Sequence, residues 1–115
     1  MDKEFVPYEP SLALKELGFD EPCLGNFADD EKHTLFTNGN RPGKVDAPTF
    51  SQAFRWFREK YGLFCYITTY DSTDFEWYVY DKDRNEWEDD TTQNTYEEAE
   101  LACLIKLIEI ANEQQ

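Results

Sequence analysis

The strongest periodic pattern in the chain lies at 49–61, where apolar residues recur every three or four positions. That spacing places them on one face of a helix. Thr49 and Gln52 form a capping box at its start, because the threonine hydroxyl accepts from a backbone N–H that has no partner within the helix. Gly62 follows the pattern and can end the helix. The apolar positions are Phe50, Ala53, Phe54, Phe57 and Tyr61.

Two further segments indicate helices. The longer one, about 95–112, opens with a second capping box formed by Thr95 and Glu98. The shorter one, 9–17, is followed by Gly18, which can adopt the positive φ of a helix stop. In the longer helix the stripe predicted to face the core is Leu101, Leu104, Ile105, Ile108 and Ala111.

Two stretches, 63–70 and 75–80, alternate with the period of two that strands require. The short polar link between them, 71–74, predicts that they pair as an antiparallel hairpin. A third short strand, 86–88, is expected to return along the hairpin. Two weaker strands are expected at 23–28 and 33–37.

These segments predict an α+β fold with the element order α-β-β-α-β-β-(β)-α. In such a fold three helices pack on one face of an antiparallel sheet, here of three to five strands. A length of 115 residues suits one domain with its own core, so we expect 1–115 to form a single domain.

The acidic charge is concentrated in one part of the chain. The net charge is −14, and residues 71–100 hold twelve acidic side chains against two basic ones. Such a field repels phosphate backbones and anionic lipids, so direct binding of nucleic acid or of membranes is not expected. Because aromatic residues make up 17% of the chain, the acidity indicates a folded protein rather than a disordered one.

The cysteines and the ends of the chain bear on its compartment. Cys23, Cys65 and Cys103 are widely spaced and form no C-x-x-C pair, which is typical of reduced thiols in the cytoplasm. The chain contains no long apolar run and no signal-peptide pattern at its start. We therefore expect a cytoplasmic protein. The lone histidine, His33, has no cysteine near it in sequence, and neither zinc nor thiol catalysis is indicated.

The outer face of the predicted hairpin combines tyrosine with acid. Alternation places Tyr66, Tyr70, Tyr78 and Tyr80 on that face, with Glu76 among them. Cross-strand aromatic pairs stabilise any sheet, so one interpretation of these residues is purely structural. The other interpretation is that these residues form a protein-binding face that attracts a basic partner. The residues predicted to bind are Tyr66, Tyr70, Glu76, Tyr78, Asp81, Asp83, Glu86, Glu88, Asp89 and Asp90.

A second candidate site is a calcium loop. Asp81, Asp83 and Asn85 match the first three ligand positions of an EF-hand. Glu86 stands where that loop needs glycine, and Thr92 stands where it needs a bidentate glutamate. A solvated hairpin turn is the simpler interpretation, so no metal and no cofactor are predicted. A small ligand- or Ca²⁺-binding accessory domain remains the alternative function.

The predicted helix at 49–61 also carries a small basic patch, Arg55, Arg58 and Lys60, with Trp56 between them. The patch is expected mainly to neutralise acid within the protein. An exposed tryptophan beside arginines is typical of contact surfaces, so Trp56 is a further candidate for one.

Three segments, 3–23, 47–62 and 96–110, resemble a family of short, functionally unassigned proteins of phages, prophages and bacterial mobile elements. Representative stretches are Leu14-Lys-Glu-Leu-Gly-Phe19, Gln52-Ala-Phe-Arg-Trp-Phe-Arg58 and Glu98-Ala-Glu-Leu-Ala-Cys103. The resemblance covers about half of the chain and brings no catalytic residues. It implies a phage or mobile-element context, in which small acidic proteins often inhibit host defences.

The sequence therefore predicts a small acidic protein that is not an enzyme and that binds a basic surface of a host protein. The most specific form of this expectation is an inhibitor of a nucleic-acid-binding defence nuclease, such as an anti-CRISPR protein. Spaced carboxylates on a rigid hairpin could then imitate a phosphate backbone.

Overall fold

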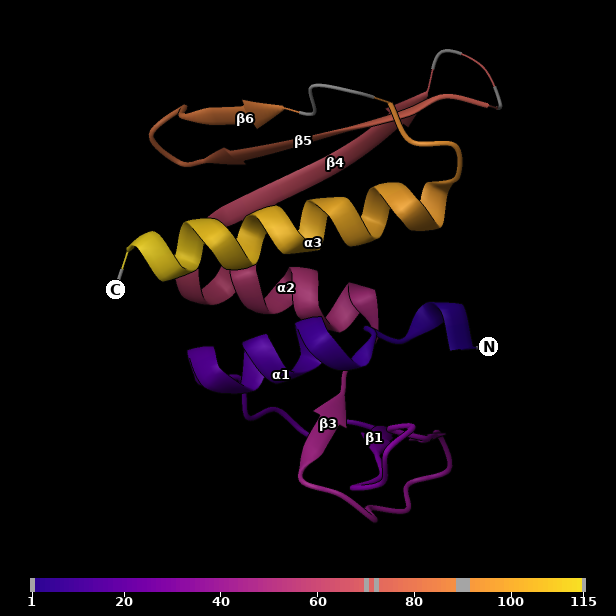
Figure 1. Cartoon of the computed structure of the whole chain (residues 1–115). Helices are drawn as coiled ribbons and strands as arrows, with labels where there is room; N and C mark the ends of the chain where they lie inside the picture. Colours follow the sequence, from indigo (N-terminus) through magenta and orange to yellow (C-terminus); the bar gives the residue numbers. More distant parts are fainter. Residues whose placement is uncertain (1, 70, 72, 89–91, 115) are drawn as a thin grey trace. The chain divides into compact units, whose positions relative to one another are not determined.

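The computed structural model describes residues 2–69, 71, 73–88 and 92–114 (Figure 1). Its contacts divide the chain into two compact units, Met1–Ala53 and Phe54–Gln115, which are described separately. In chain order the elements are η1 (Asp2–Glu4), α1 (Tyr8–Leu17), β1 (Gly25–Phe27), β2 (Leu35–Phe36), β3 (Val45–Ala47), α2 (Phe50–Tyr61), β4 (Leu63–Thr69), β5 (Phe75–Asp81), β6 (Glu86–Glu88) and α3 (Tyr96–Glu113).

The α+β class and the predicted order of elements are confirmed. Helices α1, α2 and α3 begin and end within about one residue of the predicted bounds. The strands form two antiparallel three-stranded sheets, β2-β1-β3 and β4-β5-β6, where the sequence had predicted a single sheet. The additional strand, β3, is only three residues long and is followed by Pro48, so it is too short to show a period.

The core of the first unit lies where α1 packs on β3 and the β2-β1-β3 sheet. Gly25 is required on β1, because a Cβ there would lie 2.7 Å from the Ala47 carbonyl oxygen and 2.8 Å from the Phe5 ring. The buried cluster consists of Phe5, Phe27, Val45 and Ala47, with Tyr8, Leu12 and Leu35 packed against it.

Asn26 holds this sheet to the chain that leads into β3. Its side chain is fully buried. The Asn26 amide nitrogen donates to the carbonyls of Gly43 at 3.2 Å and Val45 at 3.3 Å, and to an Asp46 carboxylate oxygen at 2.9 Å. The Asn26 amide oxygen accepts from the Gly43 N–H at 2.9 Å. Each polar atom of this buried side chain is therefore paired, as burial requires.

Helix α2 begins as the capping motif predicts, with one difference. The Thr49 hydroxyl accepts from the Gln52 N–H at 3.2 Å. The Gln52 side chain does not return to Thr49 and instead donates to the Pro22 carbonyl at 2.8 Å. The glutamine therefore ties the start of the helix to a distant loop of the same unit.

The second unit is a layer of helix on sheet, with α3 running along one face of β4, β5 and β6 (Figure 1). Strand β4 pairs with β5 through an uninterrupted register from Leu63 opposite Asp81 to Thr69 opposite Phe75. Alternate side chains of these strands are buried, among them Leu63, Trp77 and Val79. The predicted hairpin and its period of two are thus confirmed.

The start of α3 is capped as predicted, but its core stripe differs from the prediction. The Thr95 hydroxyl accepts from the Glu98 N–H at 3.1 Å and donates to the Glu98 carboxylate at 3.2 Å. Ile105 was expected in the core and is 44% exposed, so that assignment was wrong. Two residues turn a helix by about 200°, which puts Ile105 opposite the buried Cys103 and Leu107.

The Asn26 network predicts a measurable loss of stability. Replacing Asn26 with Ala leaves the half-buried Gly43 N–H without its partner and removes the bonds of a fully buried side chain, so Asn26→Ala should lower the free energy of unfolding by about 2–3 kcal/mol in urea titrations. Asn40→Ala is the matched control. Asn40 is exposed, and its hydrogen bond to the Asn38 side chain uses the backbone N–H, which the substitution keeps. Equal stability of the two variants would contradict this role for Asn26.

Candidate functional site

The β4–β5–β6 sheet has one face packed by α3 and one face of aromatic and acidic residues. Because side chains alternate along a strand, the residues between the buried ones point to the other side of the sheet. The cross-strand pairs there are Phe64 with Tyr80, Tyr66 with Tyr78 and Thr68 with Glu76. Strand β6 continues two of these rows, with Glu86 beside Tyr80 and Glu88 beside Tyr78. We call this surface the aromatic–acidic face: Phe64, Tyr66, Glu76, Tyr78, Tyr80, Glu86 and Glu88.

The rings of this face are stacked across the strands. Tyr66 and Tyr78 lie with ring centroids 4.8 Å apart and planes 18° apart. Phe64 and Tyr80 form a second stacked pair at 5.4 Å and 17°. The two pairs meet where Tyr66 approaches Tyr80 at 6.2 Å. Tyr66 is nevertheless 47% exposed and Tyr80 38% exposed, so the stack presents ring area to solvent.

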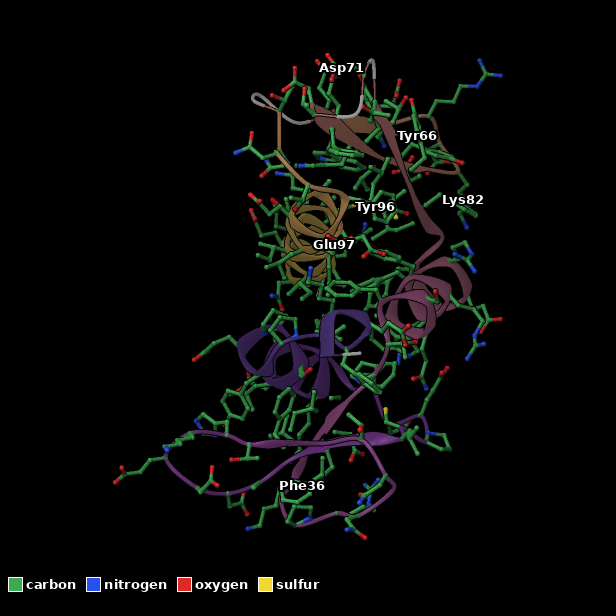
Figure 2. All side chains as sticks on the ribbon, turned by 90° about the vertical axis from the view of Figure 1, so that its right-hand side faces the viewer. Phe36, Tyr66, Asp71, Lys82, Tyr96 and Glu97 are labelled. Atoms are coloured by element: carbon green, nitrogen blue, oxygen red, sulfur yellow. The ribbon has the colours of Figure 1, made fainter. Side chains whose placement is uncertain are left out.

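Carboxylates lie beside this stack on β5 and β6. Glu76 accepts a hydrogen bond from the Tyr78 hydroxyl at 2.7 Å, which orients both side chains. Glu86 and Glu88 are exposed on the edge strand β6. Figure 2 shows Tyr66 between the two turns of the sheet, with Asp71 labelled at one turn and Lys82 at the other. Aromatic surface and negative charge therefore occupy one side of a single sheet.

The charge is mixed at the β5–β6 turn. A shallow, open hollow of about 450 Å³ lies there. Lys82 and Arg84 line this hollow beside the carboxylates at that end of the sheet. Its lining is Tyr80, Asp81, Lys82, Arg84 and Glu86. The part of the face nearer Glu76 and Glu88 is thus more uniformly acidic.

Two aspartates hold the turns of the sheet. The Asp81 carboxylate accepts from the N–H groups of Asp83 at 2.9 Å and Asn85 at 3.0 Å, and from the Asn85 side chain at 3.0 Å. The bond from the Asn85 side chain is the main reason that the pKa of Asp81 lies below its ordinary value. At the β4–β5 turn, the Asp71 carboxylate accepts from the hydroxyl and the N–H of Thr73 and from the N–H of Asp74. These bonds hold the pKa of Asp71 below its ordinary value.

These bonds bear on the calcium alternative. Both oxygens of the Asp81 carboxylate accept hydrogen bonds within the turn, so a cation there would compete with these donors. In the part of the chain that the structure describes, no group of three or more His, Cys, Asp or Glu side chains is placed to hold a metal ion. The geometry of Asp81 is that of a turn stabilised by its own side chain.

The predicted binding residues fall into three groups. The structure brings Tyr66, Glu76, Tyr78, Glu86 and Glu88 together on one face. It places Asp81 at the end of β5 opposite the buried Leu63, and Asp83 in the turn that follows, so neither lies on that face. Tyr70, Asp89 and Asp90 lie outside the described residues.

Two contributors were absent from the predicted set. Phe64 and Tyr80 form one of the two stacked pairs, yet neither was counted among the binding residues. The alternation of the sequence already assigns both to the outer side, and the missing signal was the register that sets them opposite each other.

The prediction that Trp56 is exposed on a contact surface was wrong. Trp56 is only 6% exposed, and its ring packs edge-on against Phe57 and Tyr61. Lys60 lies over it, with its ammonium 5.4 Å from the ring centroid. Trp56 therefore belongs to the core, through ring contacts that helical spacing alone does not reveal.

The thiols and the histidine form no catalytic arrangement among the described residues. All three cysteines are free, and the Cys103 thiol donates to Cys65, which lowers the pKa of Cys65. Burial raises the pKa of Cys23 to about 11. His33 belongs to the first unit and stacks on Tyr8, with ring centroids 3.6 Å apart.

Comparisons with other proteins add no assignment. No family model, no curated protein and no solved structure matches the chain. Among the described residues, no helix has both the length and the apolar character needed to cross a membrane. The resemblance to phage and mobile-element proteins thus stays a prediction.

The β5–β6 turn predicts a specific pH dependence. Removing the Asn85 side chain should raise the pKa of Asp81 toward its ordinary value near 3.8. Because the pKa of Asp81 is lower in the folded state, its contribution to stability is present above about pH 4 and is lost as pH falls through the folded-state value. Asn85→Ala should weaken that acid sensitivity.

The measurement is the titration of the Asp81 carboxyl carbon by NMR, alongside unfolding curves at several pH values. Asn94→Ala serves as the control, because Asn94 is exposed and lies outside the turn. An unchanged pKa of Asp81 in Asn85→Ala would show that the turn does not depend on this bond.

Proposed function

We propose that this chain is a non-enzymatic interaction protein that binds a basic surface of another protein through its aromatic–acidic face. The observation that carries the proposal is the exposed stack of two cross-strand aromatic pairs with carboxylates on the same side of the sheet. Arginine suits this surface, since its guanidinium stacks on aromatic rings and pairs with carboxylates.

The distribution of charge supports the same class of partner. Residues 71–100, which include Glu76, Glu86 and Glu88, have a net charge of −10. A surface of one sign attracts a partner of the other sign over long range and speeds encounter. Rigid tyrosines then supply contact area at little cost in side-chain entropy. Charge and aromatic area therefore have separate roles in the proposed interface.

The narrower form of the proposal is inhibition of a nucleic-acid-binding defence nuclease in a bacterial host, as an anti-CRISPR protein does. It is supported by the resemblance to phage and mobile-element proteins and by the fixed spacing of the carboxylates on a sheet. Such carboxylates would occupy a channel built for phosphates. The proposal includes a cytoplasmic location and no direct contact with nucleic acid or membrane.

The decisive comparison uses two triple variants with the same change in net charge, from −14 to −8. The first reverses charges on the aromatic–acidic face, and the second reverses exposed charges of the first unit. The on-face triple is Glu76→Lys, Glu86→Lys and Glu88→Lys, and the off-face triple is Glu16→Lys, Asp29→Lys and Glu31→Lys.

We expect the wild type and the off-face triple to retain basic proteins from a bacterial lysate at low salt and to release them at high salt. The on-face triple should bind them about tenfold more weakly or worse, because the attraction at the face is removed. Quantitative capture at several salt concentrations measures this difference. Equal capture by the two triples would contradict the proposal.

The narrower form has its own assay, cleavage of DNA by purified RNA-guided nucleases in the presence of each protein. The wild type and the off-face triple should inhibit at least one nuclease, and the on-face triple should not. If no nuclease of the panel is inhibited, nuclease inhibition is contradicted, while the lysate comparison still decides on the binding face.

Tyr66 tests the aromatic part independently of charge. Tyr66→Ala removes the ring stacked on Tyr78, and we expect a loss of affinity of about tenfold together with about 1 kcal/mol of stability. Tyr66→Phe keeps the ring and should bind almost as the wild type does. A thermal melt of each variant confirms that the protein is folded at the temperature of the binding assay.

A further inference from the structure

Strand β4 is the longest edge strand among the described residues. It pairs with β5 on one side, and no described strand lies along its other side. The other edge strands, β2, β3 and β6, have two or three residues, against seven in β4. A free edge of this length presents unpaired backbone N–H and C=O groups to any strand that approaches it.

The hydrogen bonds of β5 show which of its backbone groups point toward β6. Phe75 exchanges both of its backbone hydrogen bonds with Gln93, at 2.8 Å each. At the other end of the strand, the Asp81 N–H donates to the Asn85 carbonyl at 3.0 Å. Both partners lie on the side of β5 away from β4. Because the direction alternates along a strand, the even-numbered residues between them point toward β4.

The same alternation assigns the groups of β4. Its even-numbered residues complete the hydrogen-bonded pairs with β5, for example Tyr66 with Tyr78. The backbone N–H and C=O groups of Cys65 and Ile67 therefore point to the free edge. The side chains of Cys65 and Ile67 lie on the α3 side, so a strand added at this edge would leave the core packing in place.

This edge lacks the usual protection against pairing. Natural edge strands are commonly kept short, or carry charged residues, proline or a bulge. Leu63–Thr69 contains no charged residue and no proline, and its register with β5 is continuous. Strand β6, at the opposite edge of the same sheet, is short and carries Glu86 and Glu88. The two edges of the sheet thus differ sharply in their readiness to accept another strand.

Charge decides which strand fits. A second copy would bring another net charge of −14 against the same acidic sheet, which opposes pairing between copies. On a cationic strand, side chains on the outer side of the sheet would lie beside Phe64, Tyr66 and Thr68. An arginine beside Tyr66 can stack on its exposed ring, and one beside Thr68 points toward Glu76 on the next strand.

We propose that the partner contributes an extended, arginine-rich peptide segment that adds to the free edge of β4 as a fourth strand. Backbone pairing with Cys65 and Ile67 supplies the docking geometry, and arginines on alternate positions engage the aromatic–acidic face. The inference rests on the proposed function for the chemistry of the partner, and it adds the mode of binding.

The test removes one edge N–H without changing a side chain. The full chain is assembled by ligating 1–64 to 65–115 at Cys65, with an N-methyl group on the Ile67 amide. The matched control carries the N-methyl group on Leu35, whose amide points away from β1 at the β2 edge by the same alternation. The probe is a fluorescent peptide of alternating arginine and valine about as long as β4, and a second peptide has glutamate for arginine.

We expect the arginine peptide to bind the unmethylated protein and the Leu35 control alike. N-methylation of Ile67 should weaken that binding about tenfold or more, since it removes a donor and places a methyl group in the path of the added strand. The glutamate peptide should bind none of the proteins. In the unmodified protein, hydrogen exchange of the Cys65 and Ile67 amides should slow when the arginine peptide is added, while exchange of the Leu35 amide stays unchanged.

Three results would overturn the inference. One is equal peptide affinity with and without the methyl group on Ile67, together with unchanged hydrogen exchange. Another is failure of the arginine peptide to bind the unmodified protein. The third is a dimer in sedimentation experiments without peptide that the Ile67 methyl group dissociates, because the edge would then hold a second copy. None of these results affects the lysate comparison of the two triple variants, so failure here is distinguishable from failure of the proposed function.

Discussion

The pairing register of β4 with β5 is the constraint on which the candidate site depends. Seven consecutive pairs set Tyr66 opposite Tyr78 and Phe64 opposite Tyr80. A slip of one residue would exchange the faces of β4 and turn its aromatic side chains toward α3. The register is enforced from the other side of the sheet, because Leu63 and Val79 are fully buried and exposing them to water would be costly. Burial on one face therefore determines the arrangement of the exposed face.

Turn chemistry supports the same register at both ends of β5. Asp71 and Asp81 each bind backbone N–H groups of the turn that follows them, and this fixes where the chain reverses. These aspartates contribute to the acidity of the surface, yet their carboxylates are already engaged within the fold. Glu76, Glu86 and Glu88 lie on the sheet itself, where a partner can reach them. The acidic side chains of this region thus form two groups: aspartates that stabilise the turns, and glutamates on the sheet that we propose bind the partner.

Much of this arrangement follows from periodicity, and the exceptions have physical causes. The long helices and the β4–β5 hairpin have enough residues for a period to be evident, so they were predicted with nearly correct bounds. Strand β3 has three residues, and it owes its place to pairing with β1 and to Asn26, both contacts between residues far apart in sequence. Trp56 was misassigned because its burial depends on tertiary packing rather than on helical spacing. The spacing of Asp81, Asp83 and Asn85 is also that of a turn, and in the fold the Asp81 carboxylate accepts hydrogen bonds from Asp83 and Asn85.

The register can be measured directly by cross-strand NMR contacts between Hα protons, which lie closest in the pairs that do not exchange hydrogen bonds. We expect strong Hα–Hα contacts between Cys65 and Val79 and between Ile67 and Trp77. Strong contacts between Tyr66 and Val79 instead would indicate a register shifted by one residue. In that case the aromatic–acidic face would not exist as described, and the binding surface proposed for this protein would be contradicted.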